Sequence, residues 1–112
     1  MKYLCLAYGD QRKMSALTKD QFEALVAQCR VHDEELKKSG HYVSAQSLEW
    51  ASMAIRPRGG KIVTSDGPYA ETKEQVGGYL LVDCESLDEA IEVAAQVPIA
   101  VTGSVEIRPL DE

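Results

Sequence analysis

The stretch Val76-Gly77-Gly78-Tyr79-Leu80-Leu81-Val82-Asp83-Cys84 contains the clearest strand signal in the sequence. Its centre, from Tyr79 to Val82, is an uncharged apolar run, which is typical of a strand with a neighbour on each side. Ser86 follows as a helix N-cap, with Glu89 three residues later as in a capping box. We therefore expect a central strand over residues 76–84 that passes directly into a helix.

This second helix is expected to stop at Pro98, since proline cannot continue a helix. Spacing of three and four residues predicts its inward face, which comprises Leu87, Ala90, Ile91, Ala94 and Val97. A last strand is expected from Ser104 to Leu110, where apolar and charged residues alternate in the order Val105, Glu106, Ile107 and Arg108.

Two further strands are expected in the first half of the chain. The first runs from Lys2 to Tyr8 and is ended by Gly9-Asp10, and the second runs from His41 to Glu49. The residues Met14 to Ala16 are expected to lie in a loop after the first strand.

A long helix is predicted between these two strands. Thr18 and Gln21 have the spacing of a capping box, and Gly40 fits just past the C-terminus. Lys37 and Lys38 suit the negative end of the helix dipole. The inward stripe is expected to comprise Phe22, Leu25, Val26, Cys29, His32 or Asp33, and Leu36.

The residues between the two halves predict a β-hairpin. Its strands are expected at Ser52 to Pro57 and Lys61 to Ser65, joined by Arg58-Gly59-Gly60 with a Gly-Gly turn signal. The order β-α-β, hairpin, β-α-β predicts an α+β fold, a ferredoxin-like sandwich with an inserted β-hairpin, in a single domain over residues 1–112. Because each helix has one apolar stripe, the helices should cover one sheet face only. We therefore expect a homodimer packed sheet against sheet.

Composition narrows the class of function. The chain has 112 residues, 45% hydrophobic and 27% charged, and a net charge of -6 without a run of basic residues. This argues against direct nucleic-acid binding and against an anionic membrane surface. No apolar stretch approaches the roughly 20 residues that cross a bilayer.

The cysteines and histidines predict neither a disulfide framework nor a metal site. Cys5, Cys29 and Cys84 are odd in number and form no C-x-x-C, so we expect small core residues in a reducing cytoplasm. His32 and His41 lack metal-ligand spacing, and His41 is expected to be exposed. No dinucleotide or phosphate-binding fingerprint is present, so no cofactor is predicted.

The polar stretch from Asp66 to Glu74 is the candidate site. Asp66-Gly67-Pro68 predicts a turn, in which Asp66 either caps the backbone or places a carboxylate at the mouth of a cleft as general base or substrate anchor. Tyr69, Glu71 and Lys73 are candidates for ligand binding. Their alternative roles are an apolar anchor for the loop and a solvated charged face.

His32 is the second candidate catalytic residue. It lies on the inward stripe of the first helix, where a lone histidine is more often a hydrogen-bonded core residue. If it instead meets Asp66 in a cleft, the carboxylate would orient the imidazole for proton transfer near neutral pH.

The stretch from Thr64 to Tyr79, TSDGPYAETKEQVGGY, closely resembles the DGPF-type proteins of the YCII-related family. Members commonly have phenylalanine at the fourth position of the DGPF motif, where this chain has Tyr69. Two other segments agree: Leu87 to Ala90, with Pro98 after the helix, and Gly103 to Pro109. The resemblance is strong from about Ile62 to Pro109 and looser before it.

The resemblance implies a dimeric α/β-barrel of the ferredoxin-like class. The wider family is suspected of enzymatic activity because some members carry a His-Asp pair in a cleft. DGPF-type proteins often occur beside, or fused to, sigma factors of the extracytoplasmic-function type, which is an association and not a mechanism.

Two functions therefore stay open. The first is a small-molecule binding protein, or an enzyme of acid–base chemistry, that uses Asp66 and His32. The alternative is a non-catalytic regulatory or interaction module with an extracytoplasmic-function sigma factor as partner.

Overall fold

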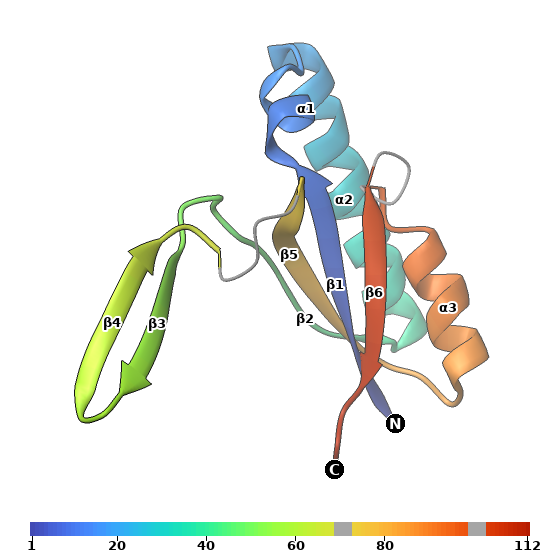
Figure 1. Ribbon diagram of the computed structural model, residues 1–112. Coiled ribbons are helices and arrows are strands. Elements are labelled where there is room, and N and C mark those ends of the chain that lie inside the picture. The colour runs from blue at the N-terminus through green and yellow to red at the C-terminus, as the bar shows by residue number, and fades with distance from the viewer. Residues whose placement is uncertain (69–72, 99–102) are drawn as a thin grey trace.

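A computed structural model describes residues 1–68, 73–98 and 103–112. Figure 1 shows strands and helices in the order strand, helix, strand, hairpin, strand, helix, strand. The elements are β1 (Lys2–Asp10), α1 (Gln11–Ser15), α2 (Lys19–Ser39), β2 (Tyr42–Ser47), β3 (Met53–Arg58), β4 (Lys61–Asp66), β5 (Glu74–Asp83), α3 (Leu87–Ala95) and β6 (Ser104–Pro109).

The main sheet is antiparallel, with the strand order β2-β5-β1-β6. The predicted central strand is confirmed, because β5 lies between β2 and β1. The α+β class and the order of elements are also confirmed, whereas the dimeric arrangement stays a prediction. In the described part of the chain, no helix is long and apolar enough to span a bilayer.

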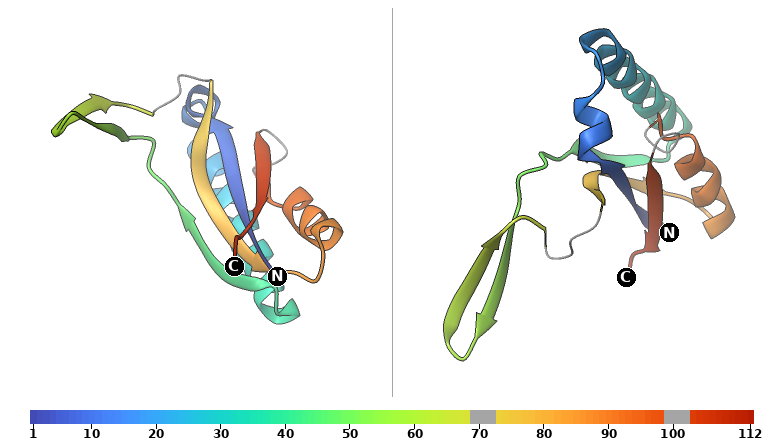
Figure 2. Two further views of the ribbon diagram at one scale, coloured as in Figure 1. Left: turned by 60° about the horizontal axis from the view of Figure 1, so that its bottom comes forward. Right: turned by 45° about the horizontal axis from the view of Figure 1, so that its top comes forward.

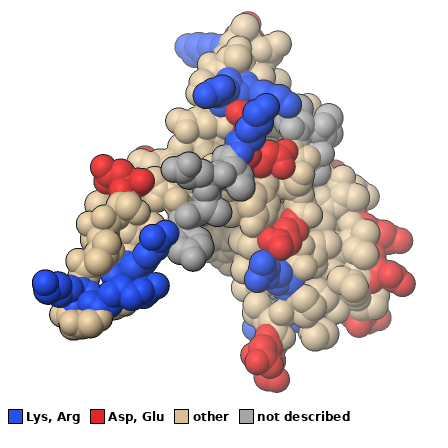
Figure 3. All heavy atoms as spheres, viewed as in Figure 1, with Lys and Arg blue, Asp and Glu red and all other residues tan. Residues whose placement is uncertain are grey.

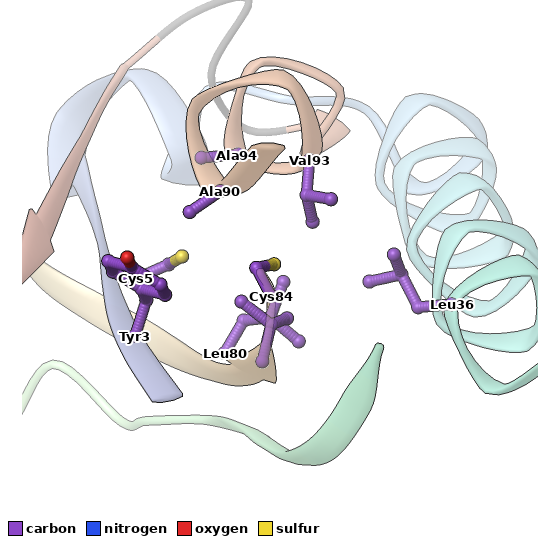
Figure 4. Packing of buried hydrophobic residues seen from close by; sticks show 9 residues of the cluster. Tyr3, Cys5, Leu36, Leu80, Cys84, Ala90, Val93 and Ala94 are labelled. Carbon is purple, nitrogen blue, oxygen red and sulfur yellow. The ribbon is translucent and has the colours of Figure 1, made fainter. Parts of the chain in front are cut away.

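The core lies between the sheet and the two longer helices, α2 and α3, which cover the same sheet face (Figures 1 and 2). Figure 4 shows side chains from β1 and β5 meeting side chains from both helices. Val82 and Cys5 have almost no exposed surface. The buried cluster comprises Tyr3, Cys5, Leu36, Leu80, Val82, Cys84, Ala90, Val93 and Ala94.

Capping explains where α2 begins and ends. The Thr18 side chain accepts a hydrogen bond from the Gln21 backbone N–H, and the Gln21 side chain accepts one from the Thr18 N–H, so the predicted capping box is confirmed. Gly40 ends the helix at φ 83°, a left-handed conformation that suits glycine. Phe22, predicted on the inward stripe, is half-exposed.

Two predictions near the N-terminus are wrong. β1 continues through Gly9 to Asp10, because both residues still pair with β5. The expected loop around Met14 is the short helix α1, which starts where the Asp10 carboxylate accepts a hydrogen bond from the Arg12 N–H.

The inward face of α3 is rotated from the predicted one. Val93 is buried, whereas Leu87 and Ile91 are half-exposed. Ser86 caps the Glu89 N–H as expected, but the Glu89 side chain accepts from the Glu85 N–H instead of completing a capping box. The short helix packs against the core mainly through small residues, so periodicity alone predicts the wrong buried face.

The hairpin β3–β4 forms a separate arm that projects from the body (Figures 1 and 2). The predicted Gly-Gly turn is confirmed, with positive φ at Gly59 and Gly60. The two strands pack extensively only against each other within the described chain.

Candidate functional site

A row of small residues crosses the helix-covered face of the sheet. Gly78 pairs with Ser47 on one side and with Ala7 on the other, and Ala7 pairs with Val105. The adjacent row on the same face carries the larger Leu80, and it belongs to the buried core. Because the small residues cannot fill the space under α2, the packing opens at this level of the sheet.

This opening is a cavity of about 320 Å³ between α2 and the sheet, which we call the helix–sheet cavity. Its floor includes Ala7, Ser47 and Gly78, and α2 contributes Cys29, His32 and Asp33. The volume is at the small end of ligand pockets, which span roughly 300–1,000 Å³. The cavity could therefore hold a compact molecule that meets an apolar floor and a few polar groups.

His32 is the best-placed proton-transfer group in this cavity. Its side chain is 7% exposed, and its ring makes no hydrogen bond to another residue in the described ranges. Every side-chain nitrogen or oxygen that is fully shut off from solvent there does have a partner. The ring nitrogens must therefore keep some access to open space, and the cavities that His32 lines provide it.

The thiols of the helix–sheet cavity are less suited to ionise. Burial, with a smaller contribution from Cys84, raises the pKa of Cys5 to about 11. Burial and then the charge of Asp33 raise the pKa of Cys29. Near neutral pH both groups are thus thiols rather than thiolates, so His32 is better suited than either cysteine to exchange a proton.

The predicted residues Asp66 and His32 lie in different parts of the molecule. Asp66 is the exposed last residue of β4, and its side chain makes no hydrogen bond to a residue that the structure describes. The cavities that His32 lines do not include Asp66, and no hydrogen bond or ion pair joins the two residues in the described chain. Their catalytic roles stay predictions.

Gly67, directly after Asp66, takes the positive φ that the predicted turn requires. Gly67 has φ 93°, and its N–H donates to the carbonyl of Ser52 at 2.7 Å. Gly67 and Pro68 line a second cavity of about 490 Å³ beside Trp50. Lys73 is exposed, while Tyr69 and Glu71 lie outside the described residues. The ligand-binding roles of these three residues remain predictions.

A hydrogen-bonded cluster that sequence reasoning missed joins α2, β2 and α3. The Ser39 hydroxyl lies 2.7 Å from His41 Nδ1, and His41 Nε2 is hydrogen-bonded to the Glu89 carboxylate. This bond, followed by the Glu85 N–H, lowers the pKa of Glu89. His41 is therefore half-buried and not exposed as expected. The glycine before it and the acidic first turn of α3 gave no signal of this contact.

The same cluster has the ligand types that zinc takes. Atoms of His41, Cys84 and Glu89 lie within 4.8 Å of one another. However, the imidazole and the carboxylate already bond each other. Burial, and then Glu89, also raise the pKa of the Cys84 thiol. A metal would have to displace that bond and a thiol proton. The hydrogen bonds of this cluster therefore form a structural link between the end of α2 and α3.

Comparison with known proteins gives the sequence context. Residues 1–112 match the model of the YCII-related domain. A relative from Rhizobium meliloti (strain 1021), the uncharacterized protein R00369, is 36% identical over 114 residues, which cover 98% of this chain and 92% of the relative.

A solved structure resembles the whole chain. It is 5-chloro-2-hydroxyhydroquinone dehydrochlorinase (TftG) from Burkholderia phenoliruptrix AC1100 in complex with 2,5-dihydroxybenzoquinone. The match covers 99% of this chain and 94% of that one, with a TM-score of 0.58 and 14% sequence identity. At that identity the likeness is one of fold.

Proposed function

We propose that this chain, which belongs to the YCII-related domain family, binds a small molecule in the helix–sheet cavity and that His32 exchanges a proton with that molecule. The similarity of its fold to that of a small-molecule enzyme supports this proposal. The observation that carries the proposal is the row of small residues opposite His32, which leaves space where a packed core would close it. An accessible imidazole with a free nitrogen is suited to general acid–base chemistry near neutral pH.

The cavity supports a particular class of ligand. A mostly apolar floor favours a flat or compact apolar body, and the imidazole favours one acidic hydroxyl, enol or carboxyl group. The dihydroxybenzoquinone complex of the structural neighbour supports a ligand of this size for the fold. Asp66 remains a second candidate group for contact with this ligand. Its substitution tests whether the DGPF-type motif and the helix–sheet cavity act together.

The proposal is tested by NMR titration of the His32 ring with catechol, benzoate and 2,5-dihydroxybenzoquinone, with glucose as a polar control. We expect His32→Gln to abolish the shift changes around the cavity, whereas His41→Gln keeps them. The variant Asp66→Asn tests whether the DGPF-type motif takes part in binding. If only Asp66→Asn abolishes binding, the site is at the hairpin and the cavity proposal is wrong.

We also propose that two copies pack sheet against sheet, as a dimeric α/β-barrel requires. The face opposite the helices carries the half-buried Leu4, Leu6, Tyr79 and Leu81. Leu4 pairs with Leu81 and Leu6 with Tyr79, so these side chains form one apolar patch. A patch of this kind on an antiparallel sheet supports a self-complementary C2 interface.

A further inference from the structure

The hairpin arm β3–β4 has two chemically different faces. Residues that pair directly across antiparallel strands share a face. One face therefore carries the pairs Met53–Asp66, Ile55–Thr64 and Pro57–Ile62, and the other carries Ala54–Ser65, Arg56–Val63 and Arg58–Lys61. The first is mainly apolar, and the second carries all three basic residues of the arm. We call them the apolar face and the basic face of the arm.

The apolar face has no cover within the described chain. Met53, Ile55 and Ile62 are 60%, 61% and 73% exposed. The radius of gyration is 15.9 Å, against roughly 13 Å for a compact domain of this length. A two-stranded hairpin alone is marginally stable in water. An arm of this composition is therefore expected to pack against another protein surface.

Charge favours a second copy of this chain as that partner. The arm, residues 53–66, holds three basic residues and one acidic residue, a net charge of +2. Since the whole chain has a charge of -6, the remainder carries -8. In the view of Figure 3, basic side chains gather at the far end of the arm, and acidic ones are spread over the body. The arm of one copy is thus opposite in charge to the body of the other.

We propose that the arm of each copy crosses the subunit boundary and packs its apolar face on the body of the other copy. This inference rests on the proposed homodimer and adds a second contact to it. The arm has six residues in each strand, so at about 3.3 Å per residue it reaches roughly 20 Å from its base. That reach extends the interface well beyond the open sheet face.

The arm is suited to packing through its apolar face and poorly suited to pairing with an added strand. Pro57 has no N–H to offer to an added strand, and the pair Arg58–Lys61 places two charges next to the turn. The opposite charges of arm and body act at short range and favour this placement of the arm, while the two whole copies, each of charge -6, repel each other.

The test compares Ile62→Lys with Val31→Lys in the full chain. Both positions are exposed, 73% and 59%, but Val31 lies on α2 and far from the arm in sequence. Analytical ultracentrifugation measures the dimer dissociation constant. We expect Ile62→Lys to raise it at least about tenfold, the equivalent of about 1.4 kcal/mol, and Val31→Lys to leave it unchanged.

A second measurement does not depend on either variant. In a dimer mixed from isotope-labelled and unlabelled copies, Ile55 and Ile62 methyl groups should show contacts to the body of the unlabelled copy. A stable dimer without such contacts overturns the arm proposal but leaves the sheet-to-sheet dimer intact. A monomer at all concentrations overturns both. Contacts or protection of the arm that form only on anionic vesicles also overturn it, in favour of a membrane surface.

Discussion

The imidazole of His41, just before β2, is hydrogen-bonded to the carboxylate of Glu89 in the first turn of α3. The two residues are 48 positions apart, and the bond ties the connection between α2 and β2 to α3. The Glu89 pKa is lowered below its ordinary 4.5, first by His41 and then by the Glu85 N–H. A group with a depressed folded pKa stabilises the fold above its unfolded pKa and loses that stabilisation as pH falls through the folded value.

We therefore expect Glu89→Gln to lower the urea midpoint at neutral pH. The difference from the wild type should shrink as the pH falls below 4.5 and through the lowered pKa of Glu89. Glu92→Gln on the same helix is the matched control and should change little. A gap between wild type and Glu89→Gln that stays constant over this range would contradict the linkage.

Of the two glycines that line the helix–sheet cavity, Gly78 has less room for a side chain than Gly77. A Cβ there would lie 2.9 Å from the backbone oxygen of Gln46, which cannot move without disturbing β2. We expect Gly78→Ala to cost about 1–3 kcal/mol in urea unfolding, as overpacking does. Gly77→Ala is the control, because its Cβ would meet the Trp50 ring at 3.0 Å and a ring can shift. A larger loss for Gly77→Ala than for Gly78→Ala would show that this account of the sheet floor is wrong.

Val82 has no exposed surface and belongs to the buried core cluster. Val82→Ala removes two buried methyl groups and leaves a cavity, so we expect a loss of about 2–3 kcal/mol in unfolding free energy. Val31→Ala, on the exposed side of α2, should stay within about 0.5 kcal/mol of the wild type. Equal losses in the two variants would mean that the core is not where the structure places it.

The three cysteines should differ in reactivity. With a pKa of about 11, Cys5 is buried and almost wholly protonated at mildly alkaline pH. Cys84 is also buried, whereas Cys29 is partly exposed at the helix–sheet cavity. We expect iodoacetamide to label Cys29 first, as read by peptide mass spectrometry. A ligand in the cavity should slow this labelling, and labelling of Cys5 before Cys29 would refute the cavity's accessibility.

Local signals predicted much of the fold. The capping residues of α2, the Gly-Gly turn of the hairpin and the apolar run of β5 depend on near neighbours in sequence, so they could be found without coordinates. The rotation of α3 could not be found, because the buried face of this short helix depends on how it packs against the sheet and α2.

The candidate site was less predictable than the fold. His32 was named from its place on the helix stripe, but its accessible ring depends on the row Ser47, Gly78 and Ala7, which comes from three different strands. The link between His41 and Glu89 likewise joins residues from separate units. Contacts of this kind have no period and no spacing in the sequence.

The sequence by itself determined the family, the α+β class and the order of the main strands and helices apart from α1, since these follow from local backbone preferences and hydrophobic periodicity. Only the tertiary structure decided that small residues align across the sheet, that the hairpin stands apart from the body and that Asp66 lies away from His32 in one chain. The physical reason is that strand register and the packing of helices on a sheet bring together residues whose separation along the chain carries no signal.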